Sequence, residues 1–441
     1  MTMISRRNAL LATLFGSGYV GLRALATGVP VSLLLNPRRA LASATPCAAG
    51  PEKPQYLIIS TSAEGDSLNA CVPGTYDDPL IVHSVAPELA PAPLTLNGRT
   101  FSAAAPWSTL AQDVLDRTVF WHLMTNTPVH ADESRVLRLM GAIDGPEMFP
   151  SLLAKRLAPC LGTIQPQPIS VGALTPAESL SYEGAALPVI PPLALKATLT
   201  KPDGPLSGLA KLREATLAQL DDVYRQNANS AQKQFLDSLI ASRHDVLGIE
   251  QDLLDALSAI QDNGPASQIL AALTLIRMNV SPVVTLHIPF GGDNHRDVGL
   301  ATESAGTVTG IAAVGFLMQQ LASAGLSDRV TFATLNVFGR TLGPGNENGR
   351  THNPNHQVSL TIGAPFRGGV VGAVGPVGGD YGALPIDSGT GAGGPGGDIA
   401  AIDSLAAFGR TLLKATGADM GDGSPPSASA QVVSAALRSS S

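Results

Sequence analysis

Charged side chains are scarce in this chain of 441 residues. They make up 14% of the sequence, against roughly 25% in an average soluble protein. The formal net charge is −7, and no basic run follows the N-terminal region. Proteins that bind nucleic acid usually carry a basic patch or stripe for the phosphates. We therefore expect no nucleic-acid partner.

Cysteine is also scarce, with only Cys47, Cys71 and Cys160 in the sequence. Three scattered cysteines make a poor zinc-thiolate site, because such sites draw on clustered thiolates. In an oxidising compartment one pair can close as a disulfide. We favour Cys71 with Cys160, which leaves Cys47 free, although the spacing does not decide among the pairings.

The N-terminus lacks the long unbroken apolar run of a membrane anchor. Its apolar stretch is interrupted by Gly16, Gly18, Gly21 and Arg23, and it ends at Ala40-Leu41-Ala42. A basic start, a moderate apolar region and small residues at the end are the layout of a cleaved export peptide. The paired arginines of Ser5-Arg6-Arg7 favour the twin-arginine route. We expect a periplasmic or secreted protein, handled by the twin-arginine machinery and without a stable membrane span after cleavage.

The remaining chain alternates apolar runs with helical patterns. Short β-branched or apolar runs at 56–60, 118–124, 281–289 and 330–335 predict strands. The patterns at 266–278, 302–324 and 399–416 predict helices. This order is typical of an α/β fold, a three-layer sandwich with a mostly parallel central sheet. We divide the chain into a signal peptide (1–42), a leader (43–54), one α/β domain (55–420) with a helical insertion (about 206–262), and a disordered tail (421–441).

Glycine and proline are abundant, at 46 and 34 residues, and they predict long connections between these elements. We expect a surface excursion over 73–106 and a mobile loop over 375–397, where glycines are dense and apolar residues few.

Polar side chains that bind metals or move protons follow several of the predicted strands. In an open parallel sheet, ligands bind beyond the carboxyl ends of the strands, so we expect these groups to meet at one rim. Carboxylates and imidazoles together suit one or two divalent cations of the zinc or manganese type. For each residue alone a structural role remains the alternative, such as an Asx turn at Asp66. The set is Asp66, His130, Asp293, His295, Arg340, His352 and His356.

Several short motifs around these residues resemble one known family, the bacterial exported family called domain of unknown function 1501. Gly291-Gly292-Asp293-Asn294-His295 resembles its Gly-Gly-Trp-Asp-Thr-His element. Val337-Phe338-Gly339-Arg340-Thr341 resembles its Ser-Glu-Phe-Gly-Arg element. Gly349-Arg350-Thr351-His352, with His356, is similar to its Gly-Thr-Asp-His-Gly-His element. Gly65-Asp66-Ser67-Leu68-Asn69 and Phe366-Arg367-Gly368-Gly369 are similar to two further elements of that family.

The resemblance implies a fold like that of the alkaline phosphatase and sulfatase superfamily and a metal-dependent hydrolase site. It implies Asp66, Asp293, His295, His352 and His356 as the candidate metal ligands. Arg340 and His130 are the candidate catalytic groups, with the Arg340 fork suited to an anionic substrate oxygen.

The chain departs from the family pattern at three positions. Thr351 and Val337 stand where the family has carboxylates, and Val129 stands where it has the serine before His130. Thr127 and Ser134 are the alternative hydroxyl nucleophiles. Two hypotheses follow: an exported metal-dependent hydrolase of phosphate or sulfate esters acting on an anionic small molecule or glycan, or an exported binding or assembly protein that kept the scaffold without the chemistry or the metal.

Overall fold

The computed structural model describes residues 53–144, 147–172, 178–199, 251–419 and 430–438, with isolated positions between 216 and 233. The predicted signal peptide and Cys47 lie outside the described residues, as does most of the predicted helical insertion.

The described chain is built around a seven-stranded sheet in the order β13-β4-β12-β9-β1-β8-β5. Its neighbours pair in parallel except for β12, which runs antiparallel to both β4 and β9. The prediction of a mostly parallel central sheet is therefore confirmed. The strands are β1 (Tyr56–Ser62), β4 (Thr118–Leu123), β5 (Ile169–Ser170), β8 (Val283–Leu286), β9 (Val330–Asn336), β12 (Gln357–Ile362) and β13 (Gly369–Val371).

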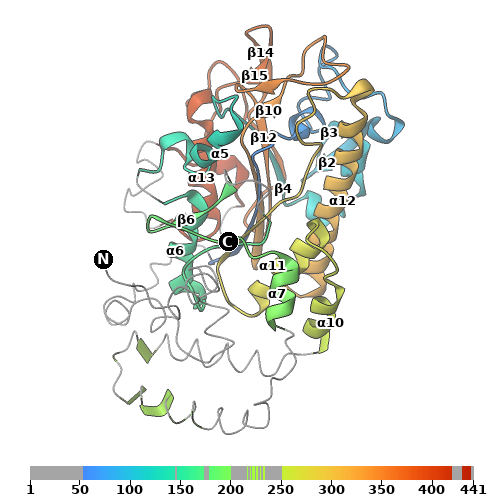
Figure 1. Ribbon diagram of the computed structural model, residues 1–441. Coiled ribbons are helices and arrows are strands. Elements are labelled where there is room, and N and C mark those ends of the chain that lie inside the picture. The colour runs from blue at the N-terminus through green and yellow to red at the C-terminus, as the bar shows by residue number, and fades with distance from the viewer. Residues whose placement is uncertain are drawn as a thin grey trace, which may run out of the picture.

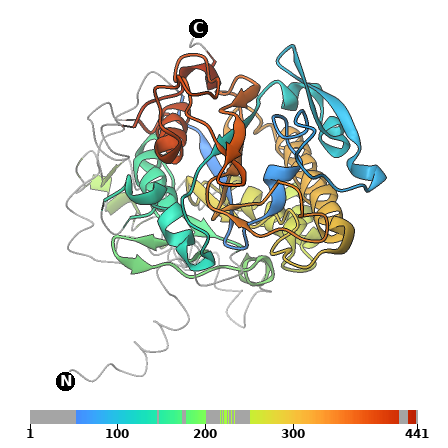
Figure 2. The same cartoon turned by 90° about the horizontal axis from the view of Figure 1, so that it is seen from above.

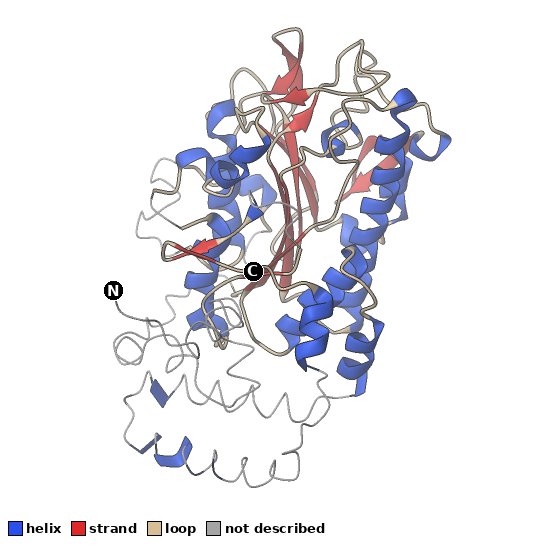
Figure 3. Cartoon of the chain, in the orientation of Figure 1, coloured by secondary structure: helices blue, strands red, loops and turns tan. Residues whose placement is uncertain are grey.

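Helices cover both faces of this sheet, as Figures 1 and 3 show. One layer holds α5 (Glu133–Val136), α6 (Phe149–Leu161) and α13 (Ser404–Ala415). The opposite layer holds α7 (Pro192–Leu199), α10 (Gln251–Ala259), α11 (Pro265–Arg277) and α12 (Ala301–Ser323). The shorter helical turns are η2 (Ser67–Ala70), η3 (Pro87–Leu89), η4 (Ala105–Thr109), α4 (Gln112–Leu115), η5 (His130–Asp132), η6 (Leu139–Gly141), η9 (Val298–Leu300), η10 (Ala401–Asp403) and η11 (Ser434–Ala436).

The central strand β1 shows why the sheet strands are continuous apolar runs in the sequence. All seven of its residues are buried. Leu57 and Ile59 belong to the core beneath α6 and α13, whereas Tyr56 and Ile58 belong to the core beneath α11 and α12. A strand covered on both faces gains from apolar side chains in both directions.

The segment Val298–Ser323, which contains α12, is the one described helix that is long and apolar enough to cross a membrane by length and composition. Its side chains Ile311, Val314, Leu317 and Leu321 are buried in the same core as α11. Packing against the sheet therefore accounts for its apolar character.

Two expected loops contain hairpins. The surface excursion over 73–106 includes β2 (Pro91–Leu96) paired with β3 (Arg99–Ala104), which lies at the margin of the molecule in Figure 2. The loop over 375–397 includes most of β14 (Val374–Val377) and β15 (Asp380–Ala383). The remaining short strands are β6 (Ser181–Tyr182), β7 (Ala185–Ala186), β10 (Gly339–Arg340) and β11 (His352–Asn353).

Two further predictions need correction. Within the tail predicted to be disordered, residues 430–438 pack against the domain: Val433 is fully buried, and Phe366 forms a β-bridge with Leu437. The favoured disulfide is also wrong, because Cys71 is a free, buried thiol while Cys160 is disulfide-bonded.

Candidate functional site

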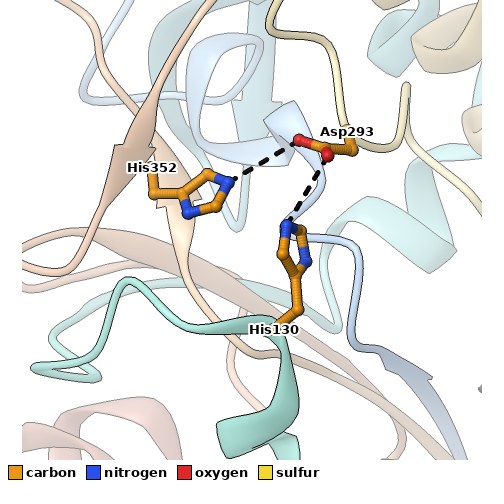
Figure 4. Close-up of side chains that lie close together, drawn as sticks. All are labelled: His130, Asp293 and His352. Carbon is orange, nitrogen blue, oxygen red and sulfur yellow. Dashed lines mark ion pairs between the residues drawn. The ribbon is translucent and has the colours of Figure 1, made fainter.

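Three polar side chains from distant parts of the chain meet beyond the carboxyl ends of the sheet strands. They are His130, Asp293 and His352, and their ligand atoms all lie within 4.8 Å of one another. His130 follows β4, Asp293 follows β8, and His352 lies in β11 beyond β9. Figure 4 shows both imidazoles turned toward the carboxylate. The rim expected from strand order therefore exists.

The distances in this cluster suit a shared ion. The Nε2 atoms of His130 and His352 lie 3.6 and 3.7 Å from the two carboxylate oxygens of Asp293. Two ligands that each lie about 2.0–2.2 Å from one ion are at most about 4.4 Å apart. His295 lies at the edge of the cluster, with its Nε2 3.1 Å from Asp293 Oδ1 and 2.8 Å from His352 Nε2.

Backbone carbonyls fix the orientation of two of these rings. His130 Nδ1 lies 2.6 Å from the oxygen of Ala63, and His352 Nδ1 lies 2.5 Å from the oxygen of Pro128. A carbonyl only accepts hydrogen bonds, so each Nδ1 carries the proton. In the neutral rings the Nε2 lone pairs are left facing Asp293. A ligating histidine is usually held in this way.

The ring of Phe338 packs against the imidazoles of both His130 and His352. It stacks on His352 at 4.2 Å between centroids and meets His130 edge-on at 5.0 Å. Gly65 is required here, because a Cβ at that position would lie 1.9 Å from the Phe338 ring and its φ is +67°. The glycine in the turn after β1 thus leaves room for the Phe338 ring that contacts both imidazoles.

We predict that Gly65→Ala destabilises the fold by about 1–3 kcal/mol, the usual range for a side chain forced into left-handed backbone or an overpacked core. It should also weaken metal binding, because Phe338 must move away from His130 and His352. Urea unfolding and zinc titration measure the two effects. Gly98→Ala is the matched control, since Gly98 also has positive φ but a Cβ there meets nothing within 4 Å. Equal losses in both variants would contradict a role for the Phe338 contact.

Arg340 holds the loops of this site together. Its side chain is fully buried, and its Nη2 donates to Asp293 Oδ1 at 2.8 Å and to the oxygen of Glu64 at 2.6 Å. Its Nε donates to the oxygen of Gly65. Its Nε and Nη2 are thus committed to protein acceptors, and its buried Nη1 has no hydrogen-bond partner among the described residues. Arg340 therefore positions Asp293. This role differs from the expected one, in which its guanidinium binds an anionic substrate oxygen.

Charge in the cluster favours the ligand forms of its side chains. Partial burial raises the pKa of the Asp293 carboxyl, but the hydrogen bond and charge of Arg340, with His295 and His130 nearby, outweigh it and lower that pKa overall. Burial lowers the pKa of His352, and the charge of Arg340 lowers it further, against the opposing effect of the hydrogen bond that His352 Nδ1 donates to the oxygen of Pro128. At neutral pH the carboxylate is therefore charged and the His352 ring neutral.

The other two predicted ligands, Asp66 and His356, lie outside the cluster of three. Asp66 is buried, and its Oδ1 accepts hydrogen bonds from the N–H groups of Phe290 and Gly292 at 3.2 and 2.8 Å. It therefore shapes the turn that presents Asp293. His356 is fully buried and contacts His122 instead.

The comparisons with known proteins bear on this region. Residues 196–387 match the model of a family described as "Protein of unknown function (DUF1501)". The DUF1501 match includes Asp293, His295, Arg340 and His352, but His130 lies before it. Among solved structures, the lipoteichoic acid synthase LtaP from Listeria monocytogenes is similar over 90% of this chain and 80% of that chain, at 9% identity and a TM-score of 0.34. A likeness this weak does not establish a shared fold. No curated protein matches the chain.

Within the DUF1501 match, a buried ion pair joins α12, which follows the loop of Asp293, to the loop before His352. Arg350 donates to both carboxylate oxygens of Glu303, from Nε at 2.5 Å and from Nη2 at 3.0 Å. Arg350 N–H donates to the oxygen of Asn294, and Asn294 Nδ2 donates to Glu303. Glu303 is not among the predicted site residues, because it lies in a helical pattern where a carboxylate is usually solvated. Its only signal was the buried character of the surrounding helix.

A pair of buried histidines lies next to the Arg340 segment. His122 Nδ1 is 2.9 Å from His356 Nε2, and His122 Nε2 is 2.9 Å from the oxygen of Pro73. His356 Nδ1 lies 3.2 Å from Asn69 Nδ2, whose amide also bonds both backbone groups of Arg340. One proton on each ring satisfies every contact. An additional proton would place two donors face to face.

We predict that acid destabilises the protein through these rings. Burial lowers the pKa of His122 from 6.5 to about 4, and burial together with the charge of His122 lowers the pKa of His356 well below its usual value. The unfolded chain therefore binds more protons than the folded one between pH 6.5 and 4. The free energy of unfolding is therefore highest above pH 6.5 and decreases as the pH falls toward 4. The decrease due to His122 alone is ~3 kcal/mol.

Urea unfolding at pH 7, 5.5 and 4.5, with EDTA present throughout, measures this loss. The double variant His122→Asn/His356→Asn should be less stable at pH 7 and show a shallower dependence on pH. An unchanged slope would refute the assignment.

Proposed function

We propose that this protein is an exported, metal-dependent hydrolase of phosphate or sulfate esters, with His130, Asp293 and His352 holding a divalent ion of the zinc or manganese type. The observation that carries the proposal is the pair of anchored imidazoles, whose Nε2 atoms both lie near one carboxylate. Two histidines and one carboxylate are a common ligand set of catalytic zinc sites.

The residues present fit such an ion. The side chains of His130 and Asp293 are 38% and 43% exposed, so water and substrate can reach the cluster. A catalytic ion needs that open position, whereas a structural ion is closed off by a fourth protein ligand. When bound, a divalent ion supplies a lowered pKa for water and polarises an ester oxygen.

The serine that the family pattern places before His130 is missing from this chain. Val129 stands directly before His130, and the hydroxyl of Thr127 donates to Asp132 Oδ2 at 2.6 Å. Water is therefore the nucleophile that we propose. His295 has an exposed ring whose Nε2 lies beside both Asp293 and His352, which makes it the group best placed to accept or return a proton.

Charge supports an anionic ester as the substrate class. Arg340 neutralises Asp293 from the buried side at 2.8 Å, and the imidazoles are neutral when they act as ligands. The cluster would therefore keep most of the positive charge of its ion on the solvent side. That charge favours a phosphate or sulfate oxygen over a neutral ester.

Export belongs to the same proposal. Residues 1–42 carry the paired arginines and small-residue end of a twin-arginine signal. Export of a folded chain suits a protein that acquires its metal before it crosses the membrane.

A second candidate is an exported binding or assembly protein that keeps the scaffold without the chemistry or the metal. Val129, Val337 and Thr351 favour it, because each replaces a hydroxyl or a carboxylate of the family pattern. The two candidates differ in both bound metal and turnover.

The test is metal analysis of protein purified from the periplasm, followed by assays with 4-nitrophenyl phosphate and 4-nitrophenyl sulfate. The hydrolase proposal expects about one zinc or manganese ion per chain and turnover that EDTA removes. An Asp113→Ala variant should keep both the metal and the turnover, since Asp113 is exposed in α4 away from the cluster. Absence of both bound metal and turnover selects the second candidate, and bound metal without turnover of either ester refutes the hydrolase proposal.

A further inference from the structure

A cavity of about 130 Å³ lies beside the edge strand β13, and the proposed hydrolase site does not use it. Its lining includes Arg99 at the start of β3, Val119 near the start of β4, and Arg367 and Gly369 around the start of β13. His130 follows the other end of β4. The cavity and the metal cluster therefore belong to opposite ends of the sheet.

The two arginines of this cavity have no acidic partner among the described residues. Neither Arg99 nor Arg367 forms an ion pair or a side-chain hydrogen bond with any residue that the structure describes. The guanidinium carbon of Arg99 lies 5.4 Å from the centroid of the Phe101 ring, which supports the side chain beside the cavity. Both side chains are exposed, and both residues line one small cavity.

Carboxylates near other lining residues bond elsewhere. Asp116 Oδ1 accepts hydrogen bonds from the N–H of Asn97 at 3.0 Å and from Gln112 at 2.8 Å. Asp387 Oδ1 accepts from the N–H and hydroxyl of Thr390. A third arginine, Arg438, donates to the backbone oxygens of Phe366 and Asp116. None of these contacts joins a carboxylate to Arg99 or Arg367.

Gly369 keeps the cavity open. It lies in β13, where glycine weakens a strand and often marks a close approach by a ligand. Its φ is not in the left-handed region, so the backbone does not require glycine there. A Cβ at this position would meet nothing within 4 Å. By contrast, a Cβ at the preceding Gly368 would lie 2.5 Å from the oxygen of Leu115.

We propose that this cavity binds a tetrahedral oxyanion, a phosphate or sulfate group, between Arg99 and Arg367. The planar fork of arginine matches the oxygens of such a group, and two guanidinium groups balance a dianion. An engineered cavity of roughly 150 Å³ holds one benzene molecule, so this one has room for the anion and little more. The group enters either as a free ion or as the end of a larger ester.

Calorimetric titration of the mature protein with sodium phosphate, sodium sulfate and methyl phosphate tests the proposal. We expect binding to the wild-type protein, about tenfold weaker affinity in Arg99→Gln and in Arg367→Gln, and loss of binding in Gly369→Val with an unchanged Tm. Arg117→Gln is the matched control, because Arg117 pairs with Asp328 and does not line the cavity. Its affinity should change less than about twofold.

The same titration on Asp293→Asn separates this site from the metal cluster, since binding at the cavity should persist there. Tighter binding of methyl phosphate than of inorganic phosphate identifies an ester as the ligand, and the reverse order identifies the free ion. Absence of binding by all three anions would overturn the proposal. Equal affinity in the wild-type, Arg99→Gln and Arg367→Gln proteins would overturn it as well.

Discussion

Replacing Asp293 with asparagine is expected to lower metal affinity by about 100-fold or more and to abolish ester hydrolysis. Loss of an outer-shell partner already costs about 10- to 100-fold, and Asp293 is the carboxylate that both His130 and His352 face. The asparagine oxygen still accepts a hydrogen bond from Arg340, so the loop should keep its position. The fold should therefore lose less than the site does.

Zinc titration, turnover of 4-nitrophenyl phosphate and urea unfolding of the same preparation separate these effects. Asp113→Asn is the matched control, an equal loss of charge at an exposed carboxylate. His295→Asn distinguishes a metal ligand from a proton-transfer group. If the His295 ring only moves protons, turnover should fall while metal affinity changes little. Full metal content and full activity in Asp293→Asn would contradict the proposed site.

Breaking the buried ion pair by Arg350→Met is expected to destabilise the fold by about 3–5 kcal/mol, because Glu303 is then left as an uncompensated buried charge. Both side chains are almost fully buried, at 0% and 2% exposed. Arg350 also donates to the oxygens of Thr341 and Val82, so its loss frees several loop carbonyls. The ligand loops should loosen, and metal affinity should fall with stability.

Urea unfolding measures this loss, with the exposed pair Arg117 and Asp328 as the matched comparison. Arg117→Met should cost no more than about 1 kcal/mol, since exposed pairs contribute little. The double variant Arg350→Met/Glu303→Leu should recover part of the loss, because it removes the stranded charge. A cost for Arg350→Met as small as that for Arg117→Met would show that the pair does not stabilise the loops.

Strand positions were predictable from the sequence where a strand is buried on both faces, because such a strand consists mainly of apolar residues. The runs at 56–60 and 330–335 correspond to β1 and β9, the centre of the sheet. The missed hairpins had a different signal. Asn97-Gly98 joins β2 to β3 and Gly378-Gly379 joins β14 to β15, with positive φ at all four residues. Such pairs favour two-residue hairpin turns, but scarce apolar residues made both segments resemble loops.

The site was predictable only in part, because strand order places loops at a rim without fixing which side chains turn into it. His352 and His356 are four positions apart and lie in one polar loop. β11 pairs His352 with Arg340 and turns it toward Asp293, whereas His356 precedes β12 and faces His122 on β4. That difference comes from tertiary pairing, and no local pattern of residues reports it. Asp66 was likewise placed at the correct rim but bonds backbone N–H groups.

Anomalous X-ray diffraction from crystals of the zinc-loaded protein would locate the bound ion. We predict one strong zinc peak about 2.0–2.2 Å from His130 Nε2, His352 Nε2 and a carboxylate oxygen of Asp293, with the Nδ1 atoms of the two rings still bonded to the oxygens of Ala63 and Pro128. A peak at Asp66 or His356, or no peak within reach of Asp293, would contradict it.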